Sequence, residues 1–208
     1  MAITGQVADT STNESERKPS RRFTFDPDRL AYLEVAGWRA YVDKKWLKLL
    51  WLLLSLAREQ FGFSWPRAVQ GAYYVTRASI IWKPMDHDVP AVRRYLRKFY
   101  RLAVKHGKGF SFDPRRVGDL ELKYWHVSRQ YSSTPYRDDS PLIPVFAELH
   151  SAIFDVSIEE AWESAIGRAR SLHAYGQIAG GHSKDIEGDW RRSEEYLREG
   201  YRSLVGVS

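Results

Sequence analysis

The chain has 208 residues, of which 43% are hydrophobic and 28% are charged, with a formal net charge of +6. This balance is typical of a globular protein with a packed core and excludes an intrinsically disordered chain. The sequence contains no cysteine. Thiolate catalysis, iron–sulfur clusters, cysteine-bound zinc and disulfides are therefore excluded.

No stretch of the sequence is typical of a membrane span or a signal peptide. The longest apolar stretch, Trp46–Ala57, is interrupted by Lys48 and Ser55. It is shorter than the about 20 residues that cross a bilayer, and it is typical of a buried helix. Residues 1–22 are polar and lack an apolar signal core, so we expect a disordered tail. These features predict a cytoplasmic protein.

Helix signals follow one another from residue 23 onward. Most expected helices begin at Ser or Asp, which cap the first turn, and several have Pro next to the cap. Ser157 and Glu160 have the spacing of a capping box. We expect the Gly-rich stretch 176–188 to be a loop. The expected helices are 27–44, 46–61, 64–82, 88–107, 114–130, 142–154, 157–175 and 189–205. No stretch alternates with period two, so the sequence predicts an all-α fold of about eight helices.

The sequence also repeats itself. Phe23–Trp38 and Phe110–Trp125 are identical at half of their positions, which include an Asp-Pro pair, a glutamate and a tryptophan. The matching segments are 23–38 with 110–125, 56–77 with 149–170, and 95–104 with 196–205. The second copy is longer in the polar segment 131–141 and in 176–188, and loops tolerate such insertions. We therefore predict an internal duplication of a four-helix unit.

The duplication determines the expected domain organisation. Residues 23–208 should form a single all-α domain, made of repeat 1 (23–108) and repeat 2 (109–208). Two similar units pack most simply about a pseudo-two-fold axis, with the same face of each unit buried.

Glu34 and Glu121 occupy matching positions on apolar helical stripes of the two repeats. A carboxylate on such a stripe is costly unless it is paired with a cation or coordinates a metal. The simplest arrangement pairs each glutamate with an arginine that is present in both repeats. These arginines are Arg77 and Arg170, Arg97 and Arg198, and Arg101 and Arg202. In the alternative arrangement, both carboxylates converge on one site at the axis.

A metal site is a weaker hypothesis. Ferritin-like di-metal bundles also place glutamates inside a helical bundle, but they need Glu-x-x-His motifs as well. The sequence has no such motif, and its six histidines do not correspond between the repeats. The remaining candidate ligands are Glu34, Glu121, His126, Asp86 and His87.

The helix expected at 88–107 is strongly basic. No acidic residue occurs between 91 and 108, and the cations there are Arg93, Arg94, Arg97, Lys98, Arg101, Lys105 and Lys108. A solvated helix face explains such a run, and a surface for nucleic acid, phosphate or acidic lipid is the alternative. Tyrosine and arginine alternate on this helix and on its counterpart in repeat 2. Tyr95 with Arg97 and Arg101, and Tyr196 with Arg198 and Arg202, are therefore candidates to contact an anionic or aromatic ligand.

Three classes of function follow from these patterns. The leading hypothesis is a helical ligand-binding or interaction protein that uses the groove between the repeats or the basic helix, with an anionic small molecule as one candidate ligand. The second is a metal-dependent helical enzyme of the oxidoreductase type. The third is a nucleic-acid-binding module that uses the basic helix. The sequence lacks the Walker, dinucleotide-binding and nucleophile-elbow motifs, so it assigns no cofactor and no enzymatic activity.

Overall fold

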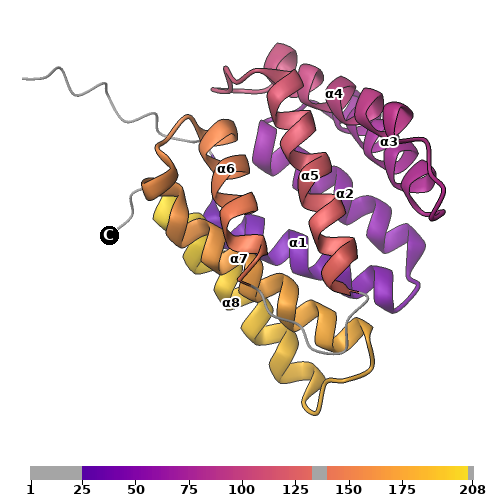
Figure 1. Ribbon diagram of the computed structural model, residues 1–208, viewed down its shortest axis with the longest axis vertical. Coiled ribbons are helices and arrows are strands. Elements are labelled where there is room, and N and C mark those ends of the chain that lie inside the picture. The colour runs from indigo at the N-terminus through magenta and orange to yellow at the C-terminus, as the bar shows by residue number, and fades with distance from the viewer. Residues whose placement is uncertain (1–24, 133–139, 206–208) are drawn as a thin grey trace, which may run out of the picture.

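The computed structural model describes residues 25–132 and 140–205 (Figure 1). These residues form eight helices and no strand, which confirms the expected all-α fold. The helices are α1 (Pro27–Val42), α2 (Trp46–Phe61), α3 (Trp65–Trp82), α4 (Val89–His106), α5 (Pro114–Ser132), α6 (Leu142–Phe154), α7 (Ile158–Ala179) and α8 (Ile186–Val205). The expected tail at 1–22 and most of the expected loop at 131–141 lie outside the described residues.

Local signals determine most of the helix ends. The Asp26 carboxylate accepts hydrogen bonds from the backbone N–H groups of Asp28 and Arg29 in the first turn of α1. The Asp88 carboxylate accepts one from the Ala91 N–H in the first turn of α4. At the start of α7, both hydrogen bonds of the predicted capping box are present. Gly62 ends α2 with a φ of +66°, a left-handed conformation that glycine adopts without steric cost.

The last connection is shorter than the sequence predicted. Helix α7 continues to Ala179 and α8 already begins at Ile186, so the loop expected at 176–188 is wrong over much of its length. Asp185, and not Asp189, caps α8, because its carboxylate accepts a hydrogen bond of 2.9 Å from the Gly188 N–H. Glycine at position 188 leaves room for this cap, because a Cβ atom there would clash with the Asp185 carboxylate.

The helices are arranged as a closed ring. Each packs against the next along the chain, and α1 also packs against α8. Helices α3 and α4 lie at one end of the molecule and α7 and α8 at the other (Figure 1). The α7–α8 contact depends on two glycines. A Cβ atom added at Gly167 would clash with the carbonyl oxygen of Tyr196 and lie 3.0 Å from the Cα of Gly200.

Apolar side chains from all parts of the ring form the core. Leu30, Val92, Leu96, Phe146 and Leu197 are among its least exposed members. Among the described helices, none has both the length and the hydropathy needed to cross a bilayer.

Candidate ligand-binding cavity

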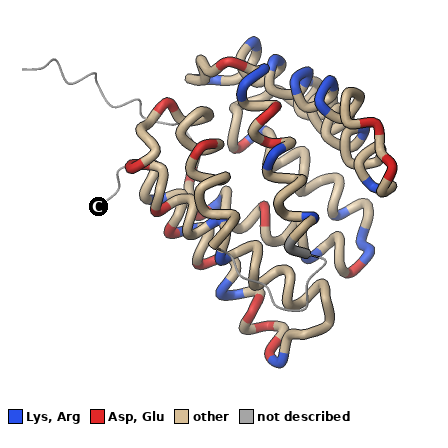
Figure 2. The backbone as a smooth tube through the Cα atoms, viewed as in Figure 1, with Lys and Arg blue, Asp and Glu red and all other residues tan. Residues whose placement is uncertain are grey.

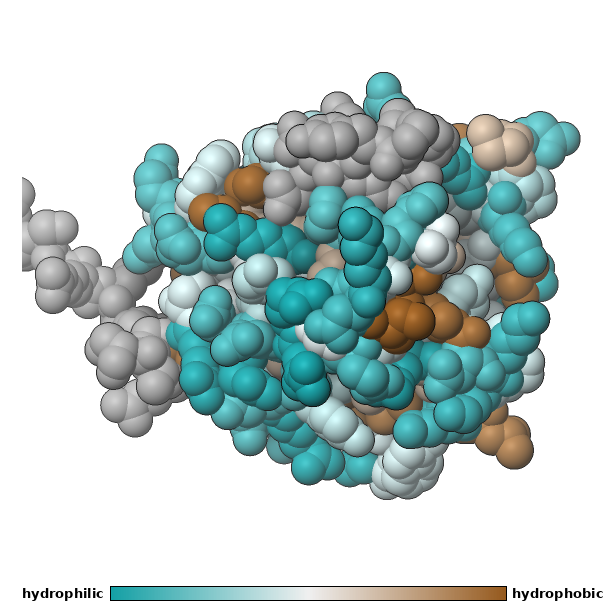
Figure 3. All heavy atoms as spheres, turned by 90° about the horizontal axis from the view of Figure 1, so that it is seen from below, coloured by the Kyte–Doolittle hydropathy of each residue, from teal (hydrophilic) through white to brown (hydrophobic). Residues whose placement is uncertain are grey.

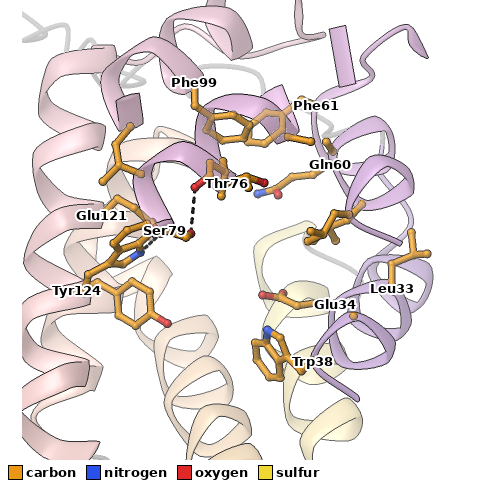
Figure 4. Close-up of a pocket in the computed structure, with 18 of the residues that line it drawn as sticks. Leu33, Glu34, Trp38, Gln60, Phe61, Thr76, Ser79, Phe99, Glu121 and Tyr124 are labelled. Atoms are coloured by element: carbon orange, nitrogen blue, oxygen red, sulfur yellow. Dashed lines mark hydrogen bonds between the residues drawn. The ribbon is translucent and has the colours of Figure 1, made fainter. Parts of the chain in front are cut away.

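The helix ring encloses a cavity of about 770 Å³ (Figure 4). Residues of all eight helices line it. Most of the wall is apolar, and its larger members include Leu33, Leu49, Leu53, Phe61, Phe99 and Phe146. Binding sites for small molecules have volumes of about 300–1,000 Å³ and are mainly apolar, with a few convergent polar groups. The cavity has the size and the chemical character of such a site.

The cavity reaches the surface beside the connection between α1 and α2. Tyr41, Trp46, Ile80 and Lys83 line it and are also exposed to solvent. They come from the end of α1, the start of α2 and the end of α3. We call this opening the mouth of the cavity.

A buried polar cluster on one wall joins α1, α7 and α8. Glu34 forms an ion pair with Arg168 and accepts a hydrogen bond of 2.7 Å from the Tyr201 hydroxyl. Arg168 also donates to the Tyr201 hydroxyl over 3.1 Å. The side chains of Glu34 and Arg168 are only 8% and 18% exposed, so water screens this pair little. Each charge in this cluster therefore has an opposite charge beside it.

Glu121 on α5 lies in a different environment. Its two carboxylate oxygens accept hydrogen bonds from the Trp125 indole N–H at 2.9 Å and the Tyr100 hydroxyl at 3.0 Å. The pKa of Glu121 is raised, mainly by burial and also by the charge of Glu34, while the Trp125 and Tyr100 hydrogen bonds and the charge of Arg168 oppose the rise. No cation forms an ion pair with Glu121 within residues 25–132 and 140–205.

Glu34 and Glu121 reach the cavity from opposite sides. Figure 4 shows Glu34 and Trp38 on one wall and Glu121 and Tyr124 on the other, with open space between them. The hydroxyl of Tyr124 points into this space. The structure therefore brings the two predicted glutamates to one cavity.

The predicted partners of these glutamates are wrong. Glu34 pairs with Arg168, and the described partners of Glu121 are neutral donors. None of the arginines expected to pair with them, Arg77, Arg97, Arg101, Arg170, Arg198 and Arg202, lines the cavity. The reason is helical phase, because these arginines project from other faces of α3, α4, α7 and α8.

Four of these arginines make contacts away from the cavity. Arg77 lies 5.8 Å from the ring centre of Tyr95, and Arg170 lies 6.0 Å from that of Tyr196. Arg202 donates to Asp28 at 2.7 Å and Arg198 donates to Glu194 at 2.7 Å. These contacts join neighbouring helices or turns of one helix and leave the predicted Tyr–Arg sets outside the cavity.

The basic face of α4 is partly neutralised. Arg93 and Arg97 both lie within 3.2 Å of the Asp119 carboxylate on α5. Lys98 lies over the rings of Tyr74 and Tyr95. The remaining cations, Arg94, Arg101 and Lys105, are exposed. Figure 2 shows Lys and Arg of α4 as blue segments along this helix.

The predicted metal ligands do not come together. His87 and His126 both pack against Trp82, with 6.0 Å between the centres of their rings. Glu34 and Glu121 lie instead at the cavity. In the described part of the chain, no three His, Asp or Glu side chains are grouped as a metal site requires. Metal ligation by these residues has no support from the geometry.

Sequence reasoning missed several residues of the cavity. Arg168 aligns with Val75 in the predicted repeat 1, so the predicted duplication gave no signal for it. Tyr100 and Tyr201 occupy matching positions in the two predicted repeats, and this match could have identified them as residues of the site. His150, whose ring lies 2.7 Å from the Ser164 hydroxyl, has no counterpart. Burial and the charge of Arg168 lower the pKa of His150 to about 3, so it is neutral at pH 7.

Comparison with known proteins gives no indication of function, so the function is inferred from the cavity. No protein-family model, no curated protein and no solved structure matches the chain.

Proposed function

We propose that the protein binds a small amphipathic molecule in its central cavity, with an apolar body and a cationic, amine-type head group. The observation that carries this proposal is the Glu121 carboxylate, which faces a largely apolar cavity and has only neutral hydrogen-bond partners in the described residues. A half-buried carboxylate at an apolar cavity, without a cation beside it, favours a ligand that supplies one. The apolar walls supply the burial that binds the rest of the ligand.

The other charges of the cavity support a cationic head group over an anionic one. Among the described residues, Arg168 is the cation of the interior and Glu34 already neutralises it, whereas Lys83, the other cation of the lining, is exposed at the mouth. His150 is neutral because its pKa is lowered to about 3. With Glu121 ionised, the interior therefore carries an excess of one negative charge. The exposed cations of α4, which suggested an anionic ligand, do not line the cavity.

We also infer that the cavity lies between two copies of one duplicated unit. Tyr100 in repeat 1 donates to Glu121 in repeat 2, and Tyr201 in repeat 2 donates to Glu34 in repeat 1. The two tyrosines correspond in the aligned repeats, and so do the two glutamates. This reciprocal exchange is what a pseudo-two-fold arrangement requires, and it supports the inference.

Three ligands with one shared tail test the proposal. Decylamine, decanol and decanoate differ only in their head group, and calorimetry below their micellar concentrations compares their affinities. We expect decylamine to bind best, decanol less well and decanoate least. Absence of binding by all three, or tightest binding of decanoate, would contradict the proposal.

Two variants locate the site. Glu121→Gln keeps the size of the side chain and removes its charge, so the preference for decylamine over decanol should disappear. Glu195→Gln is the matched control, because Glu195 is exposed on α8 and does not line the cavity. Gly37→Phe tests occupancy, since a Cβ added at Gly37 meets no atom within 4 Å and Gly37 lines the cavity. A phenyl group there should block all three ligands.

A further inference from the structure

An exposed apolar surface surrounds the mouth of the cavity where α1 meets α2. Its members are Tyr41, Trp46, Leu47, Leu50 and Trp51, and each is at least half exposed. Leu47 is 87% exposed. Figure 3 shows apolar side chains on the right of the face seen there, on the side where Figure 1 places the α1–α2 connection. We call these five residues the α1–α2 corner.

Helix α2 is apolar on two sides, and the fold buries only one of them. Its buried residues are Leu52, Ala57 and Phe61, which face the interior. Four residues of the corner, Trp46, Leu47, Leu50 and Trp51, lie on other sides of the same helix, and Tyr41 comes from the end of α1. A helix that is apolar beyond its core-facing stripe is typical of an element with a second apolar environment.

The cations beside this apolar surface indicate the nature of the second apolar environment of α2. Lys44, Lys45 and Lys48 are exposed within the same few residues, and Lys83 lies at the mouth. Lys45 pairs with Asp43 at 2.8 Å. Lys44 and Lys48 form no ion pair within the described residues. Exposed lysines at the border of exposed Trp, Tyr and Leu are typical of surfaces that insert into the interface of an anionic bilayer.

We propose that the α1–α2 corner docks on the surface of an anionic phospholipid bilayer. Trp46 and Trp51 then occupy the headgroup region, Leu47 and Leu50 reach the acyl boundary, and the lysines contact lipid phosphates. Tyr41 and Trp46 also line the mouth, so the mouth faces the bilayer in this orientation. The proposed amphipathic ligand could then pass between the bilayer and the cavity without crossing water. The docking itself does not depend on the ligand-binding function.

A second copy of the chain fits this surface less well. In a two-fold dimer the same patch faces itself, so the lysines of one copy would approach those of the other. Like charges placed together without counter-ions oppose association. An anionic membrane supplies the opposite charge along with the apolar environment.

Vesicle binding by the full chain tests the proposal. The probes are vesicles of phosphatidylcholine alone and of phosphatidylcholine with one third phosphatidylglycerol, and the readouts are co-sedimentation and a blue shift of tryptophan fluorescence. We expect binding to the anionic vesicles, reduced as salt is added because salt screens exposed charges. Absence of binding to anionic vesicles would overturn the proposal.

Variants at exposed positions show which surface binds. Lys44→Gln with Lys48→Gln should lower the partition coefficient about 30-fold, at about 1 kcal/mol for each basic residue near the surface. Leu47→Ser with Trp51→Ser should abolish the fluorescence shift. Arg101→Gln with Lys105→Gln, on the exposed face of α4, is the matched control and should leave binding unchanged. Circular dichroism establishes that each variant is folded.

Two further results would overturn the proposal. If the α4 control lowers binding as much as the lysine variant does, general positive charge binds the vesicles and not the corner. If sedimentation equilibrium shows a dimer that Leu47→Ser with Trp51→Ser dissociates, the corner is covered by a second copy of the chain.

Discussion

The hydroxyl of Tyr201 in the last helix donates a hydrogen bond of 2.7 Å to the carboxylate of Glu34 in the first helix. Both side chains are buried, and Arg168 contacts both of them. This contact closes the ring of helices by joining α1 to α8. It also places a polar cluster on the wall of the cavity, where its loss affects both stability and binding.

Removal of the Tyr201 hydroxyl should destabilise the fold. Tyr201→Phe leaves Glu34 and Arg168 each without one hydrogen-bond partner in a buried site, which costs about 1–3 kcal/mol of unfolding free energy. Urea denaturation followed by circular dichroism measures this loss. Tyr73→Phe is the control, because Tyr73 is 55% exposed. Equal stability of the two variants would show that the buried hydroxyl contributes nothing.

Removal of Arg168 should be more damaging than removal of an exposed arginine. Arg168→Met leaves the Glu34 carboxylate buried without a cation, at a cost of about 3–5 kcal/mol of unfolding free energy. Adding Glu34→Gln to this variant removes the unpaired charge and should restore part of the stability. Arg202→Met, which breaks the exposed pair with Asp28, should change stability only slightly. If the double variant is less stable than Arg168→Met alone, the pair is not the source of the loss.

Acid should destabilise the protein through His150. Its pKa is lowered to about 3 in the folded state, mainly by burial, whereas an unfolded histidine has a pKa of about 6.5. Between these values the unfolded state binds the additional proton, so the unfolding free energy falls as the pH falls. The slope approaches about 1.4 kcal/mol for each pH unit well below the unfolded pKa.

Urea titrations at pH 7, 6 and 5 measure this slope. His150→Gln keeps a polar partner for Ser164 and removes the titrating group, so its slope should be smaller. His182→Gln is the control, because His182 is exposed. A slope that is the same for all three proteins would assign the acid sensitivity to other groups.

Two glycine substitutions within helices should have opposite effects. Gly167→Ala places a methyl group against the backbone of α8 and should destabilise the protein by about 1–3 kcal/mol. Gly37→Ala points a methyl group into the open cavity, so the higher helix propensity of alanine should stabilise the protein by up to about 1 kcal/mol. Thermal and urea denaturation measure both. Destabilisation by Gly37→Ala would mean that the space beside Gly37 is filled in solution.

Local chemistry made most of the helices predictable. Asp26 with Pro27 and Ser157 with Glu160 start helices through hydrogen bonds within one turn, so a short stretch of sequence is enough to recognise them. The connection before α8 was predicted wrongly because its glycines favour a loop locally. The helix nonetheless begins at Ile186, because the Asp185 carboxylate accepts from the Gly188 N–H and the missing Cβ of Gly188 leaves room for that carboxylate.

The candidate site was predictable only in part. Glu34 and Glu121 could be predicted as site residues because a carboxylate on an apolar helical stripe is costly unless a partner compensates its charge. Their partners could not be found, since Arg168 meets Glu34 only after α1 and α7 both pack against α8. The sequence by itself determined where helices form and which of their faces are apolar, because both depend on residues a few positions apart. Only the tertiary structure decided which charges meet and that a cavity remains between them, because both depend on how the surfaces of distant helices fit together.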